Sequence, residues 1–302
     1  MVQTGWEFTD DPKGFLEVAG EFLASDPLQF TVLATVASRA AAEQDQPAAL
    51  AHPHPFWFAV WRDAEGVVAS ATMRTANFAP HPLWLLPMPP EAARDLARCL
   101  LERSEARPGE VFGVNGALPA ARICADELAS HLEASVRVTM HSRLFRCDTV
   151  IPPARPRGDL RRAVAADEGL VVEWFTAFHA EADAQAGRVS PPGTAAQITP
   201  EDAVVRVAEG RMWLWEVDGE VVHMTGVQPP SFGTVRVGPV FTPAEHRGHG
   251  YAAWVVALVT TMIQTDGHLA CLFTDQANPV SNGVYQRIGY TPVVDTAGLL
   301  VG

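Results

Sequence analysis

The stretch that decides the fold runs from Val237 to Ala252 and reads VGPVFTPAEHRGHGYA. Its first residues, Val237–Thr242, are mostly apolar and predict a strand. The segment Tyr251–Gln264 is apolar on nearly every face and predicts a buried helix. Between them, Arg247–Ala252 contains two glycines and opens the helix, so backbone N–H groups at the helix start lack partners. Those donors, together with the positive end of the helix dipole, predict an anion site.

The side chains of this turn fit a pyrophosphate. Gly248, Gly250 and Ala252 are small enough for a phosphate group to approach the backbone, and Arg247 adds a fixed positive charge. The turn is not a Walker loop, because no Gly-Lys-Ser/Thr follows, and it lacks the three glycines of the dinucleotide fingerprint. By itself the hexapeptide fits a ligand-free turn equally well.

A second segment makes the pattern specific. Asn278 precedes Tyr285 by seven residues, and Gly289-Tyr290 follow. This segment, after an Arg-x-x-Gly-x-Ala turn about 30 residues earlier, resembles the GNAT superfamily of N-acetyltransferases. The motifs cover about 220–295, and phrases such as Thr274–Asn282 are similar to a group of two-domain predicted acetyltransferases.

The resemblance implies an acyltransferase that uses acetyl-CoA as cosubstrate. In the family, the strand before the loop separates from its neighbour, and its free backbone groups bind the pantetheine arm. A tyrosine at the position of Tyr285 protonates the leaving thiolate, and its ordinary pKa of about 10 keeps it protonated at neutral pH. A packed aromatic residue is the alternative for Tyr285. The resemblance assigns to the cofactor the residues Val240, Phe241, Thr242, Arg247, Gly248, His249, Gly250, Tyr251, Ala252 and Asn278.

The acceptor site and the general base are less defined. Glu181 and His223 are candidates for contacting the substrate, and His179 and Asp183 are further candidates for the base. For each of them a solvated or structural side chain is the alternative. A covalent cysteine route is not expected, because Cys271 lies in an apolar strand where its thiol would stay protonated.

The segment Ile151–Gly158, with three prolines and one glycine, predicts a linker. The expected domains are therefore a degenerate GNAT-like domain at 1–150 and a catalytic GNAT domain at 159–302. The expected fold is α/β, built on mixed sheets. Both halves show a predicted hairpin, strand, helix, strand and helix, and a last strand is expected at Val136–Val150 in one and at Thr291–Asp295 in the other. Where the second half has its glycine turn, the first has Pro87–Ala93, which contains no glycine and whose prolines remove N–H donors. We therefore expect acetyl-CoA to bind the second half alone.

Composition limits the partners. The formal net charge is −13, and the acidic excess is shared about equally between the halves, so no basic domain for nucleic acid is expected. An acidic surface favours a cationic acceptor such as an amine. The four cysteines show no metal-ligand spacing, and neither a signal peptide nor an apolar run long enough for a bilayer is recognised. These features favour a cytoplasmic protein without a metal or a membrane contact, and leave a homodimer open.

The function expected from these observations is transfer of the acetyl group to a primary amine of a small or amino-acid-like acceptor. Two alternatives stay open. One is a non-catalytic regulatory module that binds acyl-CoA. The other is an enzyme that acetylates protein lysines or N-termini.

Overall fold

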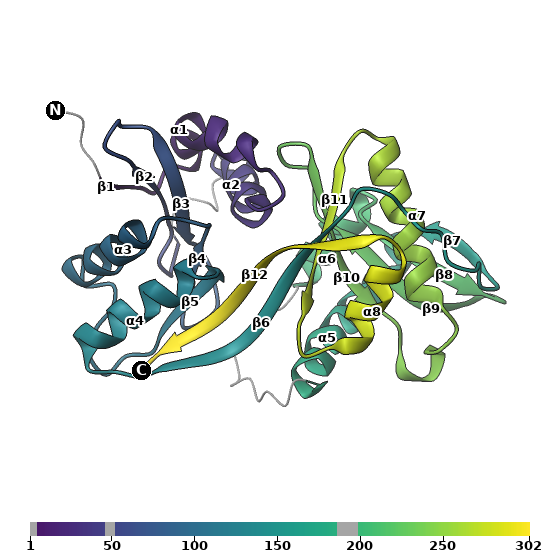
Figure 1. Ribbon diagram of the computed structural model, residues 1–302. Coiled ribbons are helices and arrows are strands. Elements are labelled where there is room, and N and C mark those ends of the chain that lie inside the picture. The colour runs from purple at the N-terminus through teal and green to yellow at the C-terminus, as the bar shows by residue number, and fades with distance from the viewer. Residues whose placement is uncertain (1–4, 46–51, 186–198) are drawn as a thin grey trace. The chain divides into compact units, whose positions relative to one another are not determined.

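The computed structural model describes residues 5–45, 52–185 and 199–302. Contacts within the chain define two compact units, whose elements are labelled in Figure 1. Unit 1 extends to Ser142 and also includes Val294–Gly302, whereas unit 2 is Arg143–Val293. The limits expected from the linker assigned the final nine residues to the second domain. They group with unit 1 because Thr296–Val301 pair with Phe112–Ala117, a strand of that unit.

Unit 1 begins with a strand and two helices that the sequence analysis did not predict. The first helix starts where the Asp11 side chain accepts a hydrogen bond from the backbone N–H of Lys13, with Pro12 in the first turn, a favourable N-terminal arrangement. The elements, in chain order, are β1 (Gly5–Thr9), α1 (Pro12–Ser25), α2 (Thr31–Glu43), β2 (Trp57–Arg62), β3 (Val68–Arg74), β4 (Leu83–Leu85), α3 (Pro90–Glu102), β5 (Phe112–Ala117), α4 (Ala120–Leu132) and β6 (Val136–Cys147).

Unit 2 repeats the same order of helices and strands. Its second helix starts with a capping box, in which Thr199 and Asp202 bond reciprocally to each other's backbone. The mixed α/β fold and the internal repeat predicted from the sequence are thus confirmed. The elements are β7 (Asp159–Arg162), α5 (Glu168–Gln185), α6 (Pro200–Ala208), β8 (Met212–Val217), β9 (Glu220–Val227), β10 (Thr234–Phe241), α7 (Tyr251–Thr265), β11 (Leu269–Asp275), α8 (Pro279–Arg287) and β12 (Tyr290–Val301).

Each repeat ends in a long strand that passes from its own unit into the other. In unit 1 the strands are hydrogen-bonded in the order β1-β2-β3-β4-β5-β12-β6, and in unit 2 in the order β6-β11-β10-β9-β8-β7. Thr296–Val301 of β12 pair antiparallel with Phe112–Ala117 of β5. The last strand predicted from the sequence stopped at Asp295, whereas β12 is longer. It continues to Val301 because a partner strand far away in the sequence pairs with it.

The core of unit 1 lies between its sheet and the helices α3 and α4. Leu96 and Leu100 of α3 and Leu128 of α4 are fully buried against Val114 of β5. Ala297, Leu299 and Val301 of β12 belong to the same cluster. Each buried Leu or Val contributes about 1.5–3 kcal/mol to the free energy of unfolding relative to an exposed one. These side chains therefore stabilise the end of β12 in unit 1.

The sheet of unit 2 is buried on both faces. On one face, Val255 and Val259 of α7 pack with Leu272 of β11. On the other, Val171 of α5 and Val207 of α6 pack on strand residues such as Leu214, Met224 and Phe241. Helices on both sides explain why β9 is buried at five consecutive positions, from Val222 to Gly226. The end of β10 is therefore reached from α5 as well as from α7.

Candidate functional site

The site begins where β10 and β11 stop pairing. The two strands are parallel and in register from Thr234 with Leu269 to Val237 with Leu272, and β10 then continues to Phe241. On its other side, the pairing of β10 with β9 shifts register between Val237 and Val240. Pro239 lies at this shift and has no N–H to donate. The end of β10 therefore departs from β11 and leaves backbone groups available to a ligand.

The turn after β10 leads to the start of α7. Gly248 and Gly250 both have φ of +82°, and open space lies where each would carry a Cβ. Gly250 is the N-cap of α7 and provides no side-chain hydrogen bond, so the first N–H groups of the helix have no acceptor on the cap. These donors, the helix dipole and the small residues are the features from which the sequence predicts an anion site.

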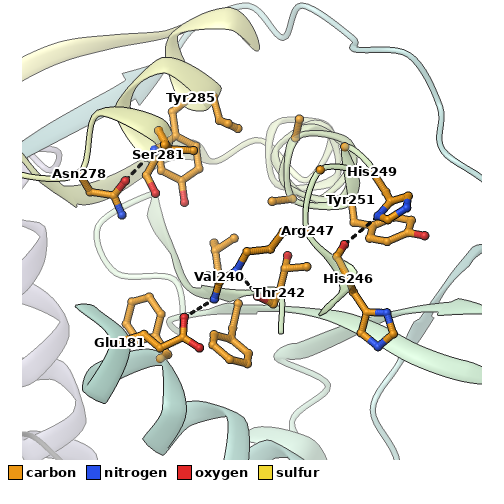
Figure 2. Close-up of a pocket in the computed structure, with 18 of the residues that line it drawn as sticks. Glu181, Val240, Thr242, His246, Arg247, His249, Tyr251, Asn278, Ser281 and Tyr285 are labelled. Carbon is orange, nitrogen blue, oxygen red and sulfur yellow. Dashed lines mark hydrogen bonds and ion pairs between the residues drawn. The ribbon is translucent and has the colours of Figure 1, made fainter. Parts of the chain in front are cut away.

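Arg247 lies on the wall of this site and is held from two directions. Its Nε donates to the backbone oxygen of Thr242 at 3.0 Å. Its other end forms an ion pair with Glu181 of α5, as Figure 2 shows. Both side chains are about 40% exposed, so solvent and salt weaken the pair. A phosphate bound at this turn would compete with the Glu181 carboxylate for the same guanidinium.

Helix α8 supplies the opposite wall. Asn278 is its N-cap and accepts a hydrogen bond from the backbone N–H of Ser281 at 3.0 Å. Tyr285 is 8% exposed, and its ring packs edge-on to Tyr290 with 6.0 Å between centroids. Burial raises the pKa of Tyr285 above its ordinary value of about 10. Its hydroxyl therefore stays protonated at neutral pH and can donate a hydrogen bond.

These walls enclose a cavity of about 720 Å³ within unit 2. Figure 2 shows Tyr285 across it from Val240 and Arg247. Among the described residues that line it, Glu181 carries the one acidic side chain, against Arg247 and Arg287. In a chain with a net charge of −13, this lining attracts anions. Of the residues predicted from the sequence, the lining includes Tyr285, Glu181, Val240, Phe241, Thr242, Arg247, Gly248, His249, Gly250, Tyr251, Ala252 and Asn278.

Three of the predicted candidates do not line the cavity: His179, Asp183 and His223. The His179 ring packs against Phe175 and Phe178 on its own helix. His223 is fully buried on β9, with Nδ1 2.7 Å from the Thr242 hydroxyl and Nε2 2.7 Å from the Thr225 hydroxyl. Burial lowers the pKa of His223 to about 3, so the imidazole is neutral at physiological pH. His223 lies behind the cavity wall, where it orients the Thr242 hydroxyl and does not contact the cavity.

The cavity also has lining residues that the sequence analysis did not single out. Phe178 and Ala182 on α5 lie one turn before and one residue after Glu181, and Ser281, Val284 and Arg287 flank Tyr285 on α8. Helical spacing is a signal that could have found Phe178, three residues before Glu181, and Ser281, four before Tyr285, because positions three or four residues apart share a helix face. The same spacing does not indicate Ala182, Val284 or Arg287.

The equivalent turn of unit 1 is built differently. β4 pairs with β5 up to its last residue, Leu85 with Gly116, and α3 begins five residues later, after Pro89. A Cβ on Gly116 would lie 2.3 Å from the Leu85 oxygen, and its φ is +143°. The two strands are therefore pressed together where β10 and β11 separate. Unit 1 has a hollow of about 1030 Å³ elsewhere, which includes Trp84 but none of the proline turn.

Within 5–45, 52–185 and 199–302, no group of three or more His, Cys, Asp or Glu side chains could hold a metal ion. None of the helices in these ranges is long and apolar enough to cross a membrane.

Comparison with known proteins supports the fold. The sequence model of the family described as FR47-like protein matches residues 227–297, which include the strand separation, the glycine turn, α7 and α8. No curated protein matches the sequence.

Several solved structures share the fold over nearly the full length of the chain. A Drosophila protein is 12% identical with a TM-score of 0.67, covering 99% of this chain and 98% of its own. A GCN5-related N-acetyltransferase from Sphaerobacter thermophilus is 15% identical with a TM-score of 0.57, covering 99% of this chain and 96% of its own. A tandem GNAT protein from the clavulanic acid biosynthesis pathway is also 15% identical with a TM-score of 0.57, covering 98% of both chains. The chain thus has the GNAT fold in tandem.

Proposed function

We propose that unit 2 is an N-acetyltransferase, which moves the acetyl group of acetyl-CoA directly to a primary amine of a small or amino-acid-like acceptor. The observation that carries the proposal is the combination, around one cavity, of a separated strand end, an open glycine turn at a helix N-terminus and a buried tyrosine on the facing helix. Each part matches one portion of a thioester cofactor.

The donor is held by its pyrophosphate and its pantetheine arm. The pyrophosphate binds at Gly248–Ala252 and to Arg247, because the backbone N–H groups and the guanidinium are donors to anionic oxygen. The pantetheine amides pair with the backbone of Val240–Thr242. This binding brings the thioester toward Tyr285, which lines the same cavity.

In the reaction, the neutral amine nitrogen attacks the thioester carbonyl, a C–N bond forms and the C–S bond breaks. Backbone N–H groups of the separated strand stabilise the negative oxygen of the tetrahedral intermediate. The thiolate leaves, and overall one proton passes from the acceptor nitrogen to the sulfur of CoA. The Tyr285 hydroxyl is protonated at neutral pH, so it acts as general acid through a hydrogen bond to the thiolate as charge develops on the sulfur.

Among the candidate bases, Glu181 is the one on the cavity wall, and it is paired with Arg247. Both ring nitrogens of His223 bond threonine hydroxyls, and burial lowers its pKa to about 3, so it is too weak and too enclosed to act as the base. The acidic surface of the chain, with a net charge of −13, favours a cationic amine as acceptor.

The test is acetyl-CoA turnover by the full chain. With a panel of primary amines, the proposal expects release of free thiol that depends on the amine and is matched by acetylated amine in mass spectrometry. Peptides with free lysines and N-termini form a second arm, and turnover with these alone would assign the protein-acetylating alternative. Binding of acetyl-CoA without turnover in either arm would contradict the proposal and favour a regulatory acyl-CoA-binding module.

A further inference from the structure

One cation of the cavity has no role in the proposed reaction. Arg287, at the last position of α8, lines the cavity together with the pyrophosphate turn. Its side chain forms neither a hydrogen bond nor an ion pair with any residue in the described ranges. By contrast Arg247, the other arginine of the lining, is bound to Glu181 and to the Thr242 backbone.

The surroundings of Arg287 keep its guanidinium along the helix. A Cβ at Gly283, one turn earlier, would lie 3.1 Å from Nη1 of Arg287, so the guanidinium extends back over this glycine. Gly283 thereby leaves the room that the guanidinium occupies. The remaining acidic side chain of the lining, Glu181, is on the opposite wall and engaged with Arg247.

A cation without a protein partner in a cavity for a polyanion is free to bind one of its charges. Acetyl-CoA carries the pyrophosphate and, on the ribose of its adenosine, a 3′-phosphate with a charge near −2 at neutral pH. The α7 N-terminus and Arg247 already account for the pyrophosphate. The 3′-phosphate is the anionic group still without a partner.

We propose that Arg287 binds the 3′-phosphate of the cosubstrate and so selects CoA esters over their 3′-dephospho forms. The inference rests on the proposed function, because it needs acetyl-CoA to bind in unit 2. A planar guanidinium can form two parallel hydrogen bonds to a phosphate, which a solvent-exposed side chain at the mouth of a cavity is able to reach.

The experiment compares two ligands on two proteins by calorimetric titration. The parent is expected to bind acetyl-CoA about tenfold more tightly than 3′-dephospho-acetyl-CoA, as one charge-assisted contact would give. Arg287→Gln is expected to bind both ligands equally, with the affinity that the parent has for the dephospho form. Unchanged binding of the dephospho ligand also shows that the variant is folded.

The matched control is Arg94→Gln. Arg94 is an exposed arginine on α3, the helix that follows the proline turn of unit 1, and it has no partner in the described residues. This control removes the same charge and should keep the parental preference.

An Arg287→Gln variant that still prefers acetyl-CoA as strongly as the parent would overturn the inference and leave the proposed function standing. A parent that binds both ligands equally would do the same. A parent that binds neither would overturn both.

Discussion

The two units share one order of helices and strands, yet they differ at a single strand-to-helix turn. In unit 2, β10 leaves β11 after Val237 and a glycine turn leads into α7. In unit 1, β4 stays paired to its end at Leu85, and prolines occupy the shorter turn before α3. The comparison teaches that the fold needs the sheet and its helices, whereas the cofactor site that we propose also needs this local separation. A repeat can therefore lose the site and keep the fold.

The largest effect is expected from Gly250→Glu. The substitution puts a side chain into the open space at Gly250 and a carboxylate where we propose that the pyrophosphate binds. Steric exclusion and like-charge repulsion together should weaken acetyl-CoA binding at least about a hundredfold. Calorimetric titration should give one site per chain for the parent and no measurable site for this variant.

Gly109→Glu is the matched control, because Gly109 in unit 1 has φ of +78° and open space at its Cβ. It carries the same strain and charge but should leave acetyl-CoA binding unchanged. Two sites in the parent, or equal losses in both variants, would remove the proposed difference between the units.

Gly116→Ala tests the closed turn of unit 1. A Cβ would meet the backbone of Leu85 at 2.3 Å, on a residue with φ of +143°. Strain and overpacking together predict a loss of about 3 kcal/mol in the free energy of unfolding, measured by urea denaturation. Gly20→Ala, at a position in α1 with open space and without positive φ, should instead be neutral or stabilising. A Gly116→Ala protein as stable as the parent would show that the strands are not pressed together there.

Tyr285→Phe separates chemistry from packing in unit 2. Removing only the hydroxyl should lower kcat at least about tenfold, the low end for a general acid, with little change in the acetyl-CoA dissociation constant because the ring still packs. Stopped-flow measurement of thiol release and calorimetry give the two quantities.

Tyr290→Phe is its control. Tyr290 is buried, bonds Thr260 at 2.6 Å and does not line the cavity, so its loss should lower thermal stability and spare kcat. Parental turnover in Tyr285→Phe would leave a water molecule as the proton source.

The smallest effect is expected from Glu181→Gln. It removes the carboxylate that competes with the pyrophosphate for Arg247, so acetyl-CoA should bind about two- to fivefold more tightly at low salt, as fits an exposed pair. The gain should shrink as salt screens the pair. Glu173 is exposed on the same helix, and Glu173→Gln should change neither the affinity for acetyl-CoA nor its dependence on salt. Weaker binding in Glu181→Gln would instead indicate that Glu181 positions Arg247 for the cofactor.

Much of unit 2 was predictable because its signals are local. The Asp218-Gly219 turn between β8 and β9, the apolar α7 and the glycines before it lie within short windows of sequence. The helices α1 and α2 were not predicted, although Asp11-Pro12 is a start signal for the first. For α2, whose N-cap Phe30 provides no side-chain hydrogen bond, the start signal is absent.

The sequence by itself determined the glycine turn, the repeat and the spacing of Asn278 and Tyr285, because backbone freedom at glycine, its loss at proline and helical periodicity are properties of neighbouring residues. The tertiary structure decided which side chains meet. It put His223 behind the wall, because helices cover both faces of β9, and it paired Arg247 with Glu181 from a helix 66 residues earlier. It also extended β12 to Val301, because this part of the strand pairs with β5, which lies far away in the sequence. Such contacts depend on packing across the sheet, which no short stretch of sequence encodes.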